Sequence, residues 1–97
     1  MNLAICAAIR SRKVLQFYYD GYFRIAEPFC HGTSTAGNEV LRAFQTGGQS
    51  PSGGVMEWRL FDVSKISSLT QTGETFSGIR PVYNPTDSAM SVVHCSV

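Results

Sequence analysis

The sequence predicts a small, mainly β domain in which one short N-terminal α-helix precedes a series of short strands. Segments rich in β-branched and aromatic residues alternate with glycine- and proline-containing turns along most of the chain. The first residues instead carry alanine and leucine, which favour helix, behind Asn2, which can cap it. With 97 residues, the chain has room for one domain and one small core. A helix followed by a β meander of this size is typical of a small barrel whose helix covers one opening.

The N-terminal part is expected to form the helix and the first hairpin. Residues 2–12 form the helix, and residues 14–19 form the first strand because they are rich in branched and aromatic side chains. Asp20-Gly21 predicts a tight turn, since glycine tolerates a positive φ. Residues 22–29 then return as the second strand.

The middle of the chain is expected to contain two more strands and two loops. Pro28 cannot donate a ladder hydrogen bond, so we expect it near the end of its strand or on an edge. Residues 31–38 read as a turn of small residues, and residues 39–45 as the third strand. The Gly- and Ser-rich stretch 46–54 predicts a flexible loop.

The C-terminal part is expected to complete the sheet. Residues 55–63 form the fourth strand, and residues 64–69 continue as another strand after a bend, with core candidates Ile66 and Leu69. Residues 77–90 contain two prolines and a turn signal, which predict an irregular segment. The last strand spans residues 91–97. Its alternation is expected to direct one set of side chains inward: Val93, Cys95 and Val97.

Arginines recur in three of the predicted strands. Arg24, Arg42 and Arg59 each stand among apolar residues, and Lys65 follows closely. Because arginine is costly to bury unless it is paired, this pattern suggests a surface that receives an anion, with Tyr19 placed to stack a base. The alternative is structural: the arginines are solvated or pair with acidic neighbours and hold the barrel together. The candidates for that pairing are Glu27, Glu57 and Asp62.

The charge balance limits which partners are expected. Eight basic and seven acidic residues leave a net charge of +1, and no polybasic tail is present. A protein that holds duplex DNA through its phosphates alone usually carries a basic excess. Any anion site must therefore come from local clustering of the arginines.

The cysteines and histidines give little support for chemistry. Three cysteines, Cys6, Cys30 and Cys95, form no CxxC motif, and their odd number argues against a disulfide framework or structural zinc. We expect them to be buried as small hydrophobic residues. His31 and His94 are expected to be structural or surface residues. No nucleophile elbow, phosphate loop or zinc-protease motif is present, so neither catalysis, metal nor cofactor is expected.

No apolar run is long enough to suggest a membrane span, so no membrane association is expected. The mildly apolar stretch 1–9 precedes its basic residues, which is the wrong order for a signal peptide. The expected location is the cytoplasm.

The chain resembles the WYL domain, a bacterial and phage module with an Sm-like, SH3-type β-barrel. The resemblance implies one WYL-like domain over residues 1–97 with its core in residues 3–70. Glu39-Val40-Leu41 stands where the family has Trp-Tyr-Leu. The matching motifs occur in the family's order: Ala7-Ala8-Ile9, Phe17-Tyr18-Tyr19 with Asp20-Gly21, Arg24 with Glu27-Pro28, and Arg59 with Phe61 and Lys65-Ile66.

A closer similarity is to small stand-alone bacterial proteins of this type. The shared segments are 27–32 (Glu-Pro-x-x-x-Gly), 41–45 (Leu-Arg-x-Phe-Gln) and 76–83 (Phe-x-Gly-x-Arg-Pro-x-Tyr). The WYL resemblance implies a non-enzymatic regulatory module that binds nucleic acid or a nucleotide-like ligand through its basic residues. The alternative is a protein–protein interaction or self-association module, since small barrels expose strand edges.

Overall fold

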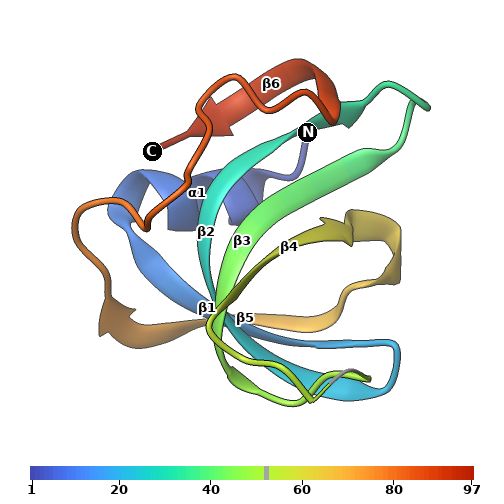
Figure 1. Cartoon of the computed structure of the whole chain (residues 1–97). Coiled ribbons are helices and arrows are strands. Elements are labelled where there is room, and N and C mark those ends of the chain that lie inside the picture. Colours follow the sequence, from blue (N-terminus) through green and yellow to red (C-terminus); the bar gives the residue numbers. More distant parts are fainter. Residues whose placement is uncertain (52) are drawn as a thin grey trace.

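The computed structural model describes residues 1–51 and 53–97, which form one helix and one antiparallel sheet (Figure 1). The strands follow the order β4-β3-β2-β1-β5, and β6 pairs with β2 outside this path. In the described residues β4 and β5 do not pair, so the sheet is not closed. The mainly β prediction is confirmed. The elements are α1 (Leu3–Ser11), β1 (Lys13–Tyr19), β2 (Tyr22–Ser34), β3 (Glu39–Gly48), β4 (Glu57–Asp62), the 3₁₀ turn η1 (Val63–Lys65), β5 (Ser67–Thr75) and β6 (Met90–Ser96).

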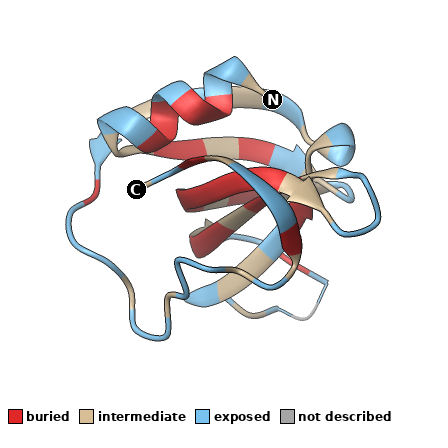
Figure 2. Ribbon diagram, turned by 90° about the horizontal axis from the view of Figure 1, so that it is seen from above, coloured by how far each residue is buried: buried red, intermediate tan, exposed pale blue. Residues whose placement is uncertain are grey.

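Helix α1 begins and ends with local signals that the sequence carries. The Asn2 side chain accepts a hydrogen bond from the Ile5 amide at 3.0 Å, which confirms the predicted cap. Arg12 ends the helix in the left-handed conformation, with φ at 52°. Figure 2 shows the buried side of α1 facing the sheet. The buried helix residues are Ile5, Cys6, Ala8 and Ile9.

The first hairpin is confirmed at the predicted turn. Tyr19 of β1 lies opposite Tyr22 of β2, and Asp20 and Gly21 connect them. Both connecting residues have positive φ, 52° and 78°, which matches the twist of the flanking strands.

Strand β2 is longer than the sequence predicts. It runs from Tyr22 to Ser34, so the predicted turn over residues 31–38 was wrong in its first half. The reason is non-local: β6 pairs with β2 from Cys30 to Ser34, and β3 pairs with it on the other side. These ladder hydrogen bonds hold small residues of low β-propensity in the extended conformation.

Pro28 lies in the middle of β2, away from both strand ends, and one side of the strand has no ladder partner there. It stands between Ala26, where the ladder to β1 ends, and Cys30, where the ladder to β6 begins. A missing N–H costs no ladder hydrogen bond at such a gap. A position near the strand end was wrong, whereas an unpaired side of the strand is found, because β2 changes neighbour halfway along its length.

Strands β3, β4 and β5 lie where the sequence predicts them, with shifted ends. Strand β3 extends to Gly48, into the predicted loop, of which Ser52 lies outside the described residues. The bend after β4 is η1, and β5 continues to Thr75. Ile66 and Leu69 pack partly buried against the core, as expected.

One of the three side chains predicted to point inward from the last strand is exposed instead. Cys95 is buried and Val97 is half-buried, but Val93 is exposed. The β2–β6 register shifts by one residue between the pairs His31–Cys95 and Gly32–Val93, and such a bulge reverses the alternation of side chains.

Two apolar clusters lie on opposite faces of the sheet. Alternation along β1 and β3 sends Leu15 and Ala43 to one face and Val14 and Phe44 to the other. The first cluster packs under α1, and the second also takes in Phe76 from the irregular segment 76–89, which contains no helix or strand. The sheet is therefore covered by α1 on one face and by segment 76–89 on the other.

Cys6 and Cys95 form a disulfide, which contradicts the expectation of three unbonded cysteines. The bond joins α1 to β6 across a sequence separation of 89 residues. Cys30 is the remaining free and buried cysteine among the described residues. The pairing depends on β6 returning beside α1, which no spacing in the sequence encodes.

Gly32 permits the close approach of β6 to β2. A Cβ atom at this position would collide with the backbone carbonyl of Val92. We expect Gly32→Ala to lower the free energy of unfolding by about 1–3 kcal/mol, because the two backbones must separate. Urea unfolding measures this, with Gly73→Ala as the matched control, since nothing lies within 4 Å of a Cβ at Gly73. Equal unfolding midpoints for the two variants would contradict the close approach.

Candidate anion-binding site

Arg24 is placed by β2 at the inner side of the sheet, opposite Phe17 of β1. Only 2% of its surface is exposed. Its guanidinium donates to Oε1 of Gln45 at 3.1 Å and to the Tyr19 carbonyl at 3.3 Å. Gln45 is itself fixed, because its amide nitrogen donates to the Gly47 carbonyl at 3.0 Å. The guanidinium is therefore held in one position by neutral groups.

No described carboxylate lies within 4.0 Å of the Arg24 guanidinium, and its Nε has no hydrogen-bond partner there. Burial lowers the pKa of Arg24 below its ordinary value, and repulsion from Arg59 lowers it further. Three aromatic rings lie 5.5–5.8 Å from its central carbon, those of Tyr19, Tyr22 and Phe61. A buried cation that lacks a carboxylate is expensive, so its site is suited to an external anion.

Arg59 is the second arginine of the site and comes from β4. Its guanidinium donates to the Ser50 hydroxyl at 3.1 Å, the Gly54 carbonyl at 2.9 Å and Oε2 of Glu57 at 3.0 Å. Glu57 is half exposed, so an ion pair in this position is weak and can be exchanged for another anion. The loop between β3 and β4 thus holds Arg59 in place.

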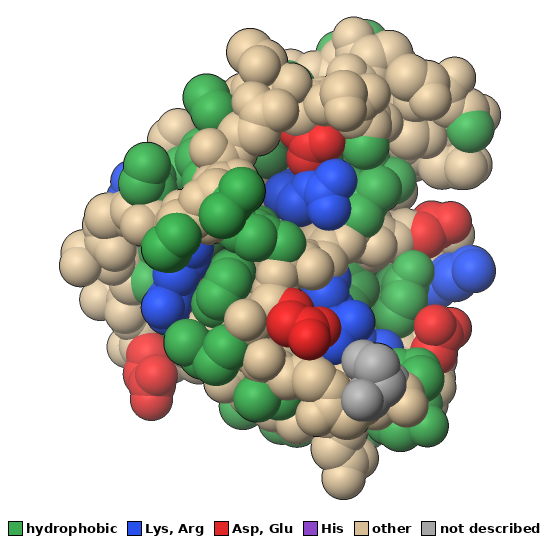
Figure 3. Space-filling model, in the orientation of Figure 1, with side chains coloured by type: hydrophobic (Ala, Val, Ile, Leu, Met, Phe, Trp, Pro, Cys, Tyr) green, Lys and Arg blue, Asp and Glu red, His purple; other side chains and the backbone are tan. Residues whose placement is uncertain are grey.

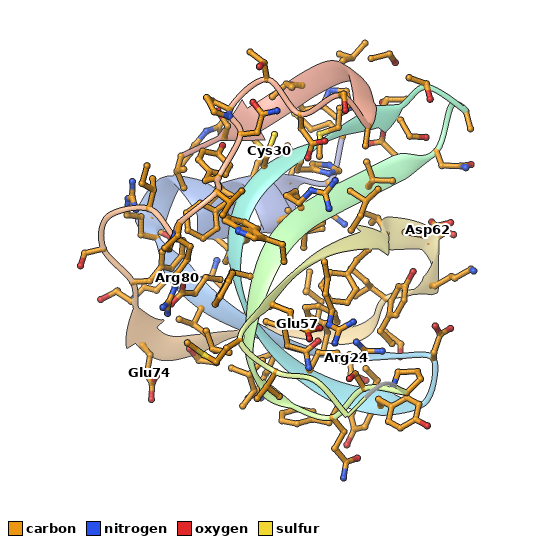
Figure 4. All side chains as sticks on the ribbon, viewed as in Figure 1. Arg24, Cys30, Glu57, Asp62, Glu74 and Arg80 are labelled. Atoms are coloured by element: carbon orange, nitrogen blue, oxygen red, sulfur yellow. A yellow bond between two sulfur atoms is a disulfide. The ribbon has the colours of Figure 1, made fainter. Side chains whose placement is uncertain are left out.

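Arg24 and Arg59 line one pocket of about 270 Å³. This volume lies close to the lower end of small-ligand sites, roughly 300 Å³. Figure 3 shows basic and acidic side chains side by side near the middle of this face, and Figure 4 shows Arg24 and Glu57 close together between β4 and the β1–β2 hairpin. The lining residues are Tyr19, Asp20, Arg24, Pro51, Trp58, Arg59, Leu60 and Phe61.

Tyr19 lies in this pocket, where the sequence places a stacking residue. Its ring packs edge-on against Phe61 with centroids 4.9 Å apart, and its hydroxyl accepts from the Asp62 amide at 3.0 Å. The ring is therefore held at the wall of the pocket by contacts at both ends.

The other two predicted site residues lie elsewhere in the described structure. Arg42 forms an ion pair with Asp87, with Nε and Oδ2 2.6 Å apart, and lines a second pocket. Lys65 is exposed in η1 and does not line the pocket of Arg24. The structural alternative named Glu27, Glu57 and Asp62 as partners for the arginines. Glu57 does pair with Arg59. Glu27 pairs instead with Arg80, with Nε and Oε1 2.8 Å apart.

Sequence reasoning missed two contributors to this region. Trp58 lines both pockets, and Gln45 orients Arg24 from a fully buried position. A glutamine inside a strand of apolar residues, preceding a glycine pair, was the available signal for Gln45. No comparable signal exists for Trp58, because a strand tryptophan usually indicates core packing alone.

His31 is fully buried. Its Nε2 accepts from the Asn2 amide at 2.9 Å, so the proton sits on Nδ1, which lies 2.7 Å from the Val40 carbonyl. Burial lowers its pKa below the ordinary value. The titratable groups facing it are Glu39, with Oε1 3.6 Å from Nε2, His94, with ring centroids 5.3 Å apart, and the N-terminal ammonium of Met1.

Glu39 is ionised at the entrance to this cluster. Hydrogen bonds from the N-terminal ammonium of Met1, from Thr33 and from His94 lower its pKa to about 2. The stabilisation from a carboxylate of this kind is complete above its ordinary pKa and is lost as the pH falls toward 2.

Stability is expected to fall as the pH is lowered from about 7 to about 5. The unfolded chain protonates His31 near its ordinary pKa of about 6.5, whereas the folded chain protonates it only at lower pH. The unfolded state binds more protons in this window, so the free energy of unfolding decreases there. Urea unfolding across this range should show a weaker pH dependence for His31→Gln than for the wild type. Identical pH dependences would contradict the buried neutral ring.

Among the described residues, no group of three or more His, Cys, Asp and Glu side chains is placed to hold a metal ion. None of the described helices has the length and apolar character needed to cross a membrane.

The site therefore consists of two arginines, one buried and one held by a loop, around a pocket with aromatic walls. No family model, curated protein or solved structure matches the chain. The WYL resemblance accordingly stays a prediction, and the function must be argued from the geometry of the site.

Proposed function

We propose that this chain is a non-enzymatic binding module whose pocket at Arg24 and Arg59 takes the phosphate of a nucleotide or of single-stranded nucleic acid. The observation that carries the proposal is Arg24, which is 2% exposed and has no described carboxylate within 4.0 Å, beside a second arginine. One guanidinium group can donate two parallel hydrogen bonds to a phosphate group. Two guanidinium groups in one pocket therefore favour an anion.

The aromatic walls favour a ligand that is more than a simple ion. Tyr19, Trp58 and Phe61 line the pocket around the two arginines. Aromatic side chains beside a basic groove are the usual means of holding single-stranded nucleic acid without reading its sequence. A strand of several nucleotides would extend beyond this pocket of about 270 Å³ and continue over the surface.

We propose that the fold of this module is an Sm-like, SH3-type barrel of the WYL kind that is open between β4 and β5, which do not pair in the described residues. The order β4-β3-β2-β1-β5, with η1 between β4 and β5, supports the assignment. In the same proposal the protein acts in a regulatory role, and a larger partner or a second copy would use the exposed edges of β4 and β5.

Fluorescence anisotropy with a labelled single-stranded oligonucleotide tests the proposal. At low salt we expect saturable binding that weakens as salt is raised, because the contacts are to phosphates. Arg24→Ala with Arg59→Ala should weaken binding at least about tenfold, since charge-assisted hydrogen bonds contribute about 1.5–3 kcal/mol each. Inorganic phosphate and a mononucleotide should compete with the oligonucleotide.

Arg10→Ala serves as the matched control, because Arg10 is an exposed arginine of α1 outside the pocket. Compared with either single variant, Arg24→Ala or Arg59→Ala, it removes the same charge, and it should leave the affinity nearly unchanged. Equal losses in the control and in the single variants would mean that net charge accounts for binding, and would overturn the site.

A further inference from the structure

A second pocket, of about 290 Å³, lies between strands β3 and β4 and the irregular segment 82–88. It shares Trp58 with the pocket of Arg24 and Arg59, and none of its other lining residues. The lining residues are Arg42, Trp58, Val82, Tyr83, Asn84, Asp87 and Ser88.

One wall of this pocket is flat and aromatic. Trp58 and Tyr83 are stacked, with ring centroids 5.6 Å apart and planes inclined by 23°. The indole Nε1 donates to the Pro81 carbonyl at 2.8 Å, which fixes the orientation of Trp58. Val82 forms the rim with φ at 66°, a conformation that β-branched residues rarely adopt, and is 91% exposed. The irregular segment, through Pro81 and Tyr83, thus holds Trp58 in place.

The polar residues that line the pocket carry no net charge together. Arg42 donates to Asp87 through Nε at 2.6 Å and through a terminal nitrogen at 3.3 Å, so the two charges cancel. The hydroxyl of Tyr83 is buried and has no hydrogen-bond partner among the described residues. A buried hydroxyl without a partner destabilises the protein, and a polar ligand atom can relieve that cost.

We propose that this pocket binds a nucleobase. An anion is disfavoured because Asp87 already neutralises Arg42, and a cation is disfavoured for the converse reason. A purely apolar ligand would strip water from the ion pair and leave the Tyr83 hydroxyl unsatisfied. A neutral planar ring with donors and acceptors on its edge matches the aromatic wall and the polar residues, since every base has a face for stacking and an edge for hydrogen bonds.

The position of Trp58 connects this pocket with the arginine site. Because Trp58 lines both pockets, a base in one and a phosphate in the other would lie beside the same side chain, and we propose that a single nucleotide supplies both. This connection rests on the proposed function, whereas binding of the base alone does not.

Trp58 is the only tryptophan of the chain, so its fluorescence reports on these pockets. Titration with the four ribonucleosides, which carry no phosphate, should give saturable quenching of that fluorescence. Tyr83→Phe removes only the buried hydroxyl, and should weaken nucleoside binding about tenfold, the effect of one hydrogen bond. It should not lower stability, because the lost group has no protein partner. Tyr18→Phe is the matched control, since Tyr18 is 48% exposed on β1 and lines neither pocket.

The outcomes separate this proposal from the proposed function. Arg24→Ala with Arg59→Ala should leave nucleoside quenching unchanged while it abolishes the additional affinity of a nucleotide over its nucleoside. If nucleosides fail to quench, or if Tyr83→Phe binds them like the wild type, the base pocket is overturned, and arginine-dependent phosphate binding still stands. If nucleosides bind but a phosphate adds nothing, the base pocket stands and the proposed function fails.

Discussion

Removal of the Cys6–Cys95 disulfide is expected to lower the free energy of unfolding by about 2–5 kcal/mol. The bond closes a loop over a sequence separation of 89 residues, which restricts the unfolded chain. It also anchors α1, a helix of nine residues that is too short to be stable unless it is docked. Urea unfolding with and without a reductant measures the effect, and Cys6→Ala with Cys95→Ala should reproduce it.

Cys30 provides the control for this prediction, because it is buried but unbonded. Reductant should still destabilise Cys30→Ala, and should leave the double variant Cys6→Ala, Cys95→Ala unchanged. A wild-type unfolding midpoint that does not respond to reductant would contradict the role of the bond. Thiol titration of the unfolded, unreduced protein gives an independent check, since Cys30 alone should react.

Arg24→Met is expected to reduce the affinity for phosphate-containing ligands at least about tenfold while changing the free energy of unfolding by no more than about 1 kcal/mol. The substitution loses hydrogen bonds to Gln45 and Tyr19, but it also removes a buried charge that has no described carboxylate partner. These two effects oppose each other. A residue kept for binding should therefore be replaceable without loss of stability.

Arg80→Met gives the matched contrast for Arg24→Met. Arg80 forms a two-point ion pair with Glu27, which is 8% exposed and would be left buried without its partner. We expect Arg80→Met to destabilise the protein more than Arg24→Met and to leave ligand affinity unchanged. The reverse order of stabilities would show that Arg24 holds the fold rather than a ligand.

Local signals account for the part of the fold that the sequence predicts. The cap at Asn2, the turn at Asp20-Gly21 and the β-rich segments all depend on neighbours within a few residues, and each is found in place. The largest errors involve β6. Its pairing with β2 extends that strand to Ser34, and its return beside α1 brings Cys6 to Cys95. Contacts between residues so far apart in the chain produce no periodic pattern of residues from which they could be predicted.

The candidate site was predictable only in part for the same reason. The sequence pattern does not distinguish Arg24, Arg42 and Arg59, because each stands among apolar residues in a predicted strand. Their difference lies in their partners. Asp87, which neutralises Arg42, comes from an irregular segment 45 residues further along the chain, and its position cannot be inferred from turn signals. Burial without a carboxylate, which distinguishes Arg24, becomes visible only in three dimensions.

The central claim, that Arg24 contacts an anion, is tested most directly by the NMR resonance of its guanidinium Nε–Hε group during titration with inorganic phosphate. This nitrogen has no hydrogen-bond partner among the described residues. The signal is assigned by its loss in Arg24→Met, and sodium chloride at equal ionic strength provides the reference. We predict a saturable shift of the Arg24 resonance, with no comparable shift for Arg80, whose Nε is bonded to Glu27. An Arg24 resonance that does not move, or that moves together with those of all the other arginines, would contradict the account.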